Sequence, residues 1–439
     1  MKTIFIIVCI GSSAGCIEAQ PSKNFNNFRD GFVVGYRALN IPTLELSYTD
    51  NLQHIQSPYK IQQQVDFFQQ AKSRLDVFET YWLSDEERSD FDLMKYETTL
   101  NLQRLALEKR WSTEKPAIIP DNNIFSIPHG NEWYAYFLNK WLGANVKPDE
   151  IYYNGIEEIE RVKAHIEDIR IKKGLSVEQF YLHLNDTGFY FNNETQLQKS
   201  FEHVKKIILQ NMPLLFNVKQ VSNVNISRGN NNALAQTPGY YDANTFYYNF
   251  SGSHYNKRQV DWLFIHEAIP GHHYQGNIEE NMQRSNIEQL FHYPGFAEGW
   301  AAYAETLGAE LGAYQTAYDE LGKWEWDLVR SVRVVIDIGL NYYGWTDEKA
   351  LATWKENIRN QDDIAMREIN RMKRWPAQVI TYKYGAMQIL NWKKELKEKQ
   401  AGAFDIKDFH EKLLAHGTLP FFIIRKNVFK KKSADITTK

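Results

Sequence analysis

Residues 266–273, with the sequence HEAIPGHH, constrain this chain more than any other stretch. They hold three imidazoles and a carboxylate directly after the apolar run 262–265. In a regular helix, the side chain one turn after His266 would come from Pro270, which cannot bind a metal. Proline removes a backbone donor and clashes with the previous turn, and the next residue, Gly271, tolerates dihedral angles that other residues avoid. The sequence therefore predicts a helix that is interrupted at these two residues.

This interruption bears on which histidine can act together with His266. On a straight helix His273 returns to the same face, but about 10.5 Å further along the axis. That is too far for two nitrogens that must each come within about 2.1 Å of one zinc ion. If the Pro-Gly pair bulges out, His272 falls where the second ligand normally lies. We therefore rank His272 above His273 as a ligand, and His273 stays the alternative.

A histidine followed directly by a glutamate on a helix is typical of zinc hydrolases, where the two supply a metal ligand and a general base. Such a site needs a third protein ligand and a position for water. Glu298, 32 residues after His266, opens an alanine-rich helical stretch and is the candidate. Glu305 shares its face, seven residues on, and is placed to orient a histidine. The predicted metal ligands are His266, His272 and Glu298, and the predicted catalytic base is Glu267.

Five segments in order resemble a bacterial family catalogued as a domain of unknown function: HEAIPGHH, GFAEGWAAYAE, RSVRVVIDIGL, RWPAQVITYKYGAMQIL and FHEKLLAHGTLP. The resemblance covers roughly residues 148–420. That family is placed among zincin-like metallopeptidases with two histidines and a glutamate, which implies a mostly helical zincin fold and peptidase activity. Members with another residue after PGH support His272 as the ligand. The family has a histidine at the position of Asn341, and no role of that histidine carries over to this chain.

The later motifs supply candidates around the predicted metal. Tyr382 matches the family motif, and a phenol suits hydrogen-bond donation to a developing oxyanion; a structural role is the alternative. Arg330, Arg333 and Asp337 interrupt a long apolar helical stripe over residues 324–343, which indicates either buried ion pairs or the lining of a cleft. The predicted substrate-binding residues are Arg333, Gln378 and Lys383.

The first 19 residues indicate export. A basic start at Lys2 precedes the apolar run 4–10, which is too short to span a bilayer. Residues 13–16 resemble a lipoprotein cleavage box with Cys16 as the lipidated residue, and cleavage after Ala19 is the alternative. We predict a periplasmic protein or a membrane-anchored lipoprotein whose one membrane contact is an anchor at Cys16. Because both cysteines lie in this segment, the mature chain has no thiolate for a zinc site or a nucleophile.

The remaining pattern predicts a mainly α (α+β) fold with a small β-sheet just before the His266 helix. In zincin-like proteins an edge strand there binds extended peptide, which the resemblance implies for this sheet. We find no internal repeat and no clear linker, so we predict one zincin-like unit over residues 20–439 with a deep central cleft. Its expected parts are a helical N-terminal part (about 24–200), strands at 214–218, 221–224 and 245–250, and a metal-site part (about 210–428).

The formal charge of −3, with 24% charged residues, argues against nucleic acid as a partner. The predicted function is hydrolysis of peptides with Zn²⁺ as the cofactor. An exported zinc- and peptide-binding lipoprotein without turnover is the alternative, which Asn341 keeps open and Glu267 argues against. A third interpretation, histidines that merely satisfy a helical core, explains less because buried imidazoles rarely cluster beside a carboxylate without a metal or catalytic role.

Overall fold

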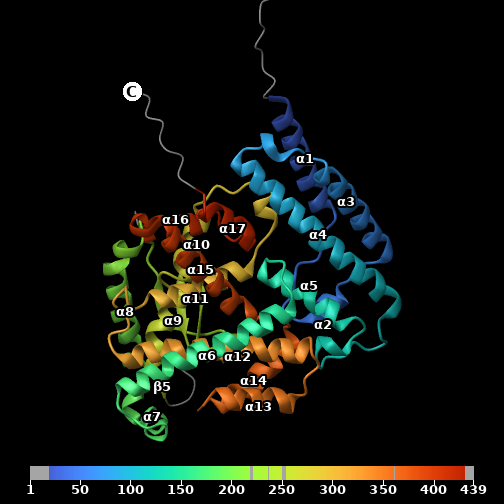
Figure 1. Cartoon of the computed structure of the whole chain (residues 1–439). Helices are drawn as coiled ribbons and strands as arrows, with labels where there is room; N and C mark the ends of the chain where they lie inside the picture. The colour runs from blue at the N-terminus through green and yellow to red at the C-terminus, as the bar shows by residue number, and fades with distance from the viewer. Residues whose placement is uncertain (1–18, 218–220, 236, 250–253, 360, 431–439) are drawn as a thin grey trace, which may run out of the picture.

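The computed structural model describes the parts of the chain numbered 19–217, 221–235, 237–249, 254–359 and 361–430 (Figure 1). In these parts the chain is mainly helical and carries a small β-sheet, which confirms the predicted fold class at this level. The predicted export segment lies outside the described residues except for Ala19, and so does Cys16. Where the structure describes the chain, no helix combines the length and apolar character needed to cross a membrane.

Three N-terminal helices pack along one edge of the molecule, and two shorter ones lie beside them (Figure 1). The longest begins with a capping box: the Ser84 hydroxyl accepts from the backbone N–H of Glu87, and the Glu87 carboxylate accepts from that of Ser84. Each bond satisfies an N–H that would otherwise stay unpaired, so this helix has a fixed start. The five helices are α1 (Ala19–Ala38), α2 (Tyr48–Gln53), α3 (Pro58–Asp76), α4 (Asp85–Glu114) and α5 (Gly130–Leu142).

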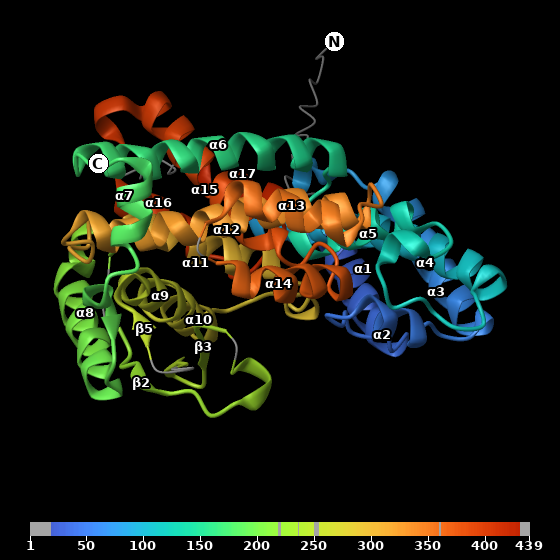
Figure 2. The ribbon, with the colours of Figure 1, turned by 90° about the horizontal axis from the view of Figure 1, so that it is seen from below.

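Two long helices, α6 (Pro148–Lys172) and α12 (Ala317–Asn341), run side by side through the centre of the molecule (Figure 2). From Leu328 to its end every residue of α12 is buried. Charged side chains in that half must therefore find partners inside the protein. Helices α13 (Asp347–Asn357) and α14 (Asp362–Arg374) pack against α12, and α7 (Val177–His183) follows α6 along the chain.

The predicted sheet is present, next to the helix that carries His266. Its strand order is β2-β4-β3, with β2 parallel and β3 antiparallel to β4, so β3 is an edge strand. Phe246 of β4 packs between Phe201 and Phe264, with ring centroids 4.9 and 5.9 Å away. These two residues come from α8 (Glu194–Leu215) and α9 (Val260–Glu267). The strands are β2 (Asn225–Arg228), β3 (Gly239–Asp242) and β4 (Thr245–Tyr248), and a separate pair is β1 (Tyr190–Phe191) with β5 (Tyr255–Asn256).

The strand predicted at 245–250 is confirmed over β4, but the two earlier strand predictions are wrong. Residues 214 and 215 end α8, 216 and 217 follow it outside any strand, and 218 lies outside the described residues. Residues 221–224 lie just before β2 instead of within a strand. The reason is the amphipathic face of α8, whose helical spacing of buried residues runs on to Leu215 and outweighs the local β-type composition.

Two apolar cores fill the molecule, and each draws on early and late parts of the chain. The first lies around α9 and joins α1, α3 and α8 to the C-terminal helices; the second lies around α12. In the first core two helices cross at Gly299 and Gly385, where a Cβ on Gly299 would lie 2.4 Å from the Cα of Gly385. The single unit over 20–439 stays a prediction. The remaining helices are α10 (His272–Glu280), α11 (Pro294–Ala304), α15 (Ile380–Gln400), α16 (Ile406–Leu414) and α17 (Phe421–Val428).

Candidate metal centre

The helix that carries the first histidine breaks where the sequence predicts. Helix α9 ends one residue after His266, and α10 begins at His272. A Cβ on Gly271 would lie 1.9 Å from the carbonyl oxygen of His266, so no other residue fits this turn. The indole N–H of Trp300, on α11, donates to the carbonyl oxygen of Pro270 at 2.8 Å. The break is thus fixed by close backbone approach from one side and by a hydrogen bond from the other.

This turn brings His266, His272 and Glu298 together, and their ligand atoms all lie within 4.8 Å of one another. The Oε2 of Glu298 lies 3.3 Å from Nε2 of His272 and 3.6 Å from Nε2 of His266. Two ligands at about 2.0–2.1 Å in a tetrahedral zinc site are about 3.3 Å apart. The Oε2 of Glu298 is buried and has no hydrogen-bond partner among the described residues. The three side chains therefore fit a zinc ion, which would satisfy the orphaned oxygen.

The charges of these groups also favour a cation. Burial alone would raise the pKa of Glu298, but the adjacent imidazoles hold that pKa well below its ordinary value. Burial lowers the pKa of His266, yet Glu298 and Glu305 outweigh it and raise the pKa to about 9. Two carboxylates thus hold a positive charge at this imidazole, and a bound dication would replace it.

Two buried residues, Glu305 and Arg330, orient the ring of His266. The Nδ1 of His266 is 2.7 Å from Oε1 of Glu305, whose other oxygen accepts from Nη1 of Arg330 at 2.7 Å. The carboxylate fixes the ring so that Nε2 faces Glu298. Arg333, one turn further along α12, pairs with Glu368 at 3.0 Å. Both arginines thus form buried ion pairs, while the predicted role of Arg333 in substrate binding stays a prediction.

Glu267 adjoins the metal cluster without belonging to it. Its side chain is half-buried and forms no hydrogen bond to another described residue. Burial raises its pKa, and the nearby His266 and His272 lower it in part. A carboxylate with a raised pKa and no partner is suited to accept and release a proton.

Tyr382, on α15, packs beside the same histidine. Its ring centroid is 6.0 Å from that of His266 and lies 5.5 and 5.3 Å from the guanidinium carbons of Arg330 and Arg333. Burial raises the pKa of Tyr382, as does the charge of Glu298, so the phenol stays protonated and can donate a hydrogen bond.

Arg371 of α14 is a residue that the sequence reasoning missed. Its Nη2 donates to Oε1 of Gln378 at 2.8 Å, and its guanidinium lies next to the Tyr382 hydroxyl. It therefore ties the predicted Gln378 to Tyr382. The sequence offers only a weak signal for Arg371. It is one of several basic residues on the amphipathic helix 362–374, and the pattern does not single it out.

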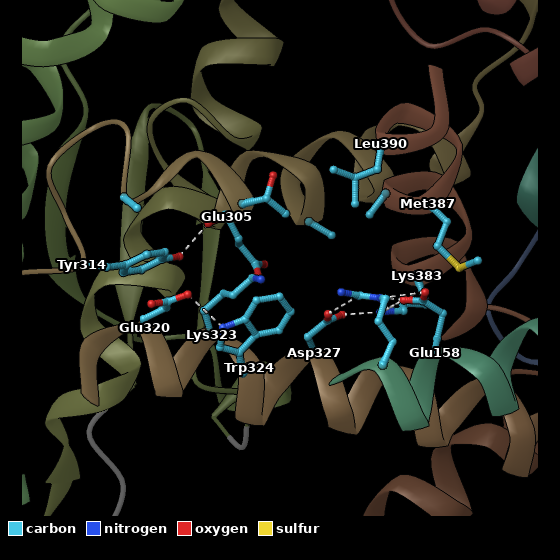
Figure 3. A pocket seen from close by; sticks show the side chains of 15 residues that line it. Glu158, Glu305, Tyr314, Glu320, Lys323, Trp324, Asp327, Lys383, Met387 and Leu390 are labelled. Carbon is cyan, nitrogen blue, oxygen red and sulfur yellow. Dashed lines mark hydrogen bonds and ion pairs between the residues drawn. The ribbon is translucent and has the colours of Figure 1, made fainter. Parts of the chain in front are cut away.

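The structure does not bring Lys383 to this cluster. Its ammonium lies 2.6 Å from Glu158 and 2.8 Å from Asp327, in a separate pocket (Figure 3). Successive residues of a helix point about 100° apart, so Lys383 faces away from its neighbour Tyr382. Its predicted role in substrate binding stays a prediction.

Two further residues also lie outside the triad. His273 is buried, with Nε2 3.0 Å from the carbonyl oxygen of Ser222 and Nδ1 3.2 Å from the hydroxyl of Tyr241. Asn341 is buried at the end of α12, where its amide donates to the carbonyl oxygen of Met372. Neither is among the three residues whose ligand atoms converge.

A mainly helical fold in which two histidines and a glutamate converge, beside a second glutamate that forms no hydrogen bond to another described residue, defines a class of candidate metal-binding proteins. The chain belongs to the family described as bacterial protein of unknown function (DUF885), whose sequence pattern matches residues 106–428. This confirms the resemblance to a bacterial family of unknown function. No curated protein matches the chain.

Two solved structures share the fold. A candidate lipoprotein from Colwellia psychrerythraea has a TM-score of 0.65 at 20% identity, covering 84% of this chain and 68% of that one. A candidate lipoprotein of unknown function from Shewanella oneidensis has a TM-score of 0.66 at 16% identity, covering 95% of this chain and all of that one. At these identities the likeness shows the fold alone.

Proposed function

We propose that this chain is a zinc-dependent hydrolase with a zincin-like fold that cleaves peptide bonds. The observation that carries the proposal is the buried Oε2 of Glu298, which has no hydrogen-bond partner in the part of the chain that the structure describes and lies within 3.6 Å of two imidazole nitrogens. Glu267 strengthens it, because a site that only binds a metal needs no unpaired carboxylate beside it.

In this proposal His266, His272 and Glu298 hold the metal, and Glu305 keeps the first of them oriented. Zinc bound there would act as a Lewis acid and lower the pKa of water toward about 7. Glu267 takes a proton from the attacking water and passes it to the leaving amine. The Tyr382 hydroxyl, kept protonated by burial, donates to the carbonyl oxygen as negative charge develops there.

A peptide is the substrate class that the sheet favours. Strand β3 pairs with β4 on one side only, and within the described residues its other side has no strand partner. Its Tyr241 contacts His273, the neighbour of the proposed ligand His272. An extended peptide added to this edge would run close to the metal by main-chain hydrogen bonds. A deep cleft between this edge and α12 belongs to the same proposal.

We place the protein outside the cytoplasm, anchored through a lipid at Cys16. The support is the export-type sequence before Ala19 and the description of both solved relatives as candidate lipoproteins. The alternative without turnover rested on the missing histidine at Asn341. In the structure Asn341 is buried and donates to the carbonyl oxygen of Met372. The binding protein without turnover therefore stays the second candidate, and the experiment below separates it from the hydrolase.

The test is the metal content of the purified mature chain, measured beside the cleavage of a mixed peptide library. We expect one metal ion per chain, and we expect Glu267→Gln to keep the metal while the cleavage rate falls by about 10²–10⁴. Glu280→Gln, at the exposed end of α10, is the matched control and should change neither. Absence of bound metal would overturn the site, and a metal without cleavage in the unaltered chain would overturn the hydrolase.

A further inference from the structure

A second pocket lies on the other side of Glu305 from His266. It encloses about 230 Å³ between α6, α12, α15 and the turn that carries Glu305 (Figure 3). This is smaller than the roughly 300–1,000 Å³ of pockets that take drug-sized ligands. Part of its wall is apolar, formed by Met387, Leu390 and several alanines, and the rest carries charged groups.

Most of these charges already satisfy one another. The Nζ of Lys383 lies 2.6 Å from Glu158 and 2.8 Å from Asp327, and Nη2 of Arg161 lies 2.8 and 3.3 Å from the same two carboxylates. We call these four residues the ion quartet. Both oxygens of Glu305 are also taken, by His266 and Arg330. These residues hold the walls together and have little left to offer a ligand.

Two groups of opposite charge remain. Lys323 is only 6% exposed, and no carboxylate of the described residues lies within 4.0 Å of its ammonium. Its Nζ lies 2.9 Å from the ring centroid of Trp324, and its side chain extends into the pocket (Figure 3). Glu320 accepts one hydrogen bond, from the indole N–H of Trp324 at 3.0 Å, and has no cation of the described residues within 4.0 Å.

The surroundings of Lys323 keep it available. Burial lowers its pKa to about 8, an effect that the charges of Asp327 and Glu305 partly offset. The group therefore stays largely protonated at neutral pH. A buried ammonium without a hydrogen-bonded anion is costly, so an acceptor brought by a ligand would be favourable.

We propose that this pocket binds a free α-amino acid with an apolar side chain. Lys323 receives the carboxylate, Glu320 receives the ammonium, and Met387 and Leu390 pack against the side chain. Because Lys323 and Glu320 lie three residues apart on one face of α12, both can reach the two charges of one zwitterion. A plain anion would leave Glu320 unpaired, and a plain amine would meet Lys323 as a like charge. The proposal does not depend on the metal.

The test is isothermal titration of the full mature chain, treated with a chelator, with glycine, alanine, leucine and phenylalanine in turn. We expect leucine to bind, and both 4-methylpentanoate and 3-methylbutylamine, which each lack one of its charges, to bind about 10- to 100-fold more weakly. Lys323→Met and Glu320→Gln should each weaken leucine by a similar factor. Lys393→Met, a half-buried lysine of α15 outside the pocket, is the matched control and should leave binding unchanged.

Thermal unfolding of each variant separates lost binding from lost folding. Lys323→Met removes a buried charge that has no described carboxylate within 4.0 Å, so it should fold at least as stably as the unaltered chain. No binding of any of the four amino acids would overturn the proposal. Binding of 4-methylpentanoate as tightly as leucine, with no effect of Glu320→Gln, would also overturn it in favour of a simple carboxylate site. Because the metal is absent, either result leaves the proposed hydrolase untouched.

Discussion

Two charged clusters lie near Glu305, which contacts His266 of the metal centre and lines the same pocket as the ion quartet, and they differ in how far their charges are satisfied. In the ion quartet each carboxylate lies within 3.3 Å of both cations. In the metal centre the Oε2 of Glu298 is buried and forms no hydrogen bond to any described residue, although two imidazole nitrogens lie within 3.6 Å. A closed cluster, in which every charge has a partner, holds helices together. In an open cluster, which has an unpartnered atom, the cost of burial is offset only when a ligand supplies the missing partner. Burial of charge is therefore common to both clusters, and the unsatisfied carboxylate oxygen is what distinguishes them.

The largest expected effect comes from a buried acid that belongs to neither cluster. Asp337 accepts from the Tyr134 hydroxyl at 2.7 Å and from the backbone N–H of Ala377, but it has no ion pair among the described residues. Burial raises its pKa to about 7, despite these hydrogen bonds. Since the folded pKa exceeds the unfolded value of about 3.9, its contribution to stability is complete below about pH 4 and is lost as the pH rises through about 7.

A difference of about three between those pKa values corresponds to about 4 kcal/mol. The free energy of unfolding, measured with urea at pH 4, 6 and 8, should fall by that order because of Asp337. In Asp337→Asn this fall should be smaller by the same amount. An equal fall in both proteins would mean that Asp337 is held charged, as the acids of the ion quartet are.

Lys383→Met removes one of the two cations of the ion quartet. It leaves Arg161 as the one described cation within 4.0 Å of Glu158 and Asp327, so we expect the free energy of unfolding to drop by about 3 kcal/mol at pH 7. Metal content should not change. Lys393→Met, whose nearest carboxylate lies 3.9 Å away, should cost much less. An unchanged stability with a raised KM for peptides would instead support the predicted role of Lys383 in substrate binding.

The sequence reveals those parts of the open cluster that depend on local stereochemistry. Pro270 and Gly271 predict the helix break because proline cannot continue the hydrogen bonds of a helix and glycine adopts dihedral angles that other residues avoid. The break then determines where His272 lies. Glu298 follows from the need for a third ligand on a helix that packs on the first. These conclusions need no knowledge of distant residues.

The closed cluster and the strands depend instead on contacts far apart in the chain. No sequence feature near Lys383 predicts that Glu158 of α6, which lies 225 residues earlier in the chain, forms an ion pair with it. For the same reason residues 214 and 215 have a strand-like composition but continue α8, because the buried face of that helix extends to Leu215. Arg371 was missed because its contacts with Gln378 and Tyr382 arise only in the folded chain.

Glu305→Gln tests the residue that contacts His266 of the metal centre and also lines the pocket of the ion quartet. The amide can still accept from His266, but it cannot pair with Arg330, so we expect metal affinity to fall by about 10- to 100-fold. Glu368→Gln is the control, since it takes the same kind of partner from Arg333 without touching His266. Equal stability losses with a loss of metal affinity only in Glu305→Gln would show support of the ligand. Equal metal losses in both would show a general loosening of α12.

The smallest effect on metal is expected for His273→Gln, which separates the two adjacent histidines. In the structure His273 donates to the carbonyl oxygen of Ser222 and accepts from the Tyr241 hydroxyl, so both of its nitrogens are already satisfied. Metal affinity should change by less than about tenfold, which is less than about 1.4 kcal/mol. His272→Gln should abolish tight metal binding, because it removes one of the three converging ligands. Equilibrium dialysis with Zn²⁺ measures both, and the opposite pattern would make His273 the ligand. Because each lost hydrogen bond costs about 1 kcal/mol, His273→Gln should nevertheless lower the free energy of unfolding. That result would indicate that His273 stabilises the fold by joining α10 to Tyr241 of β3.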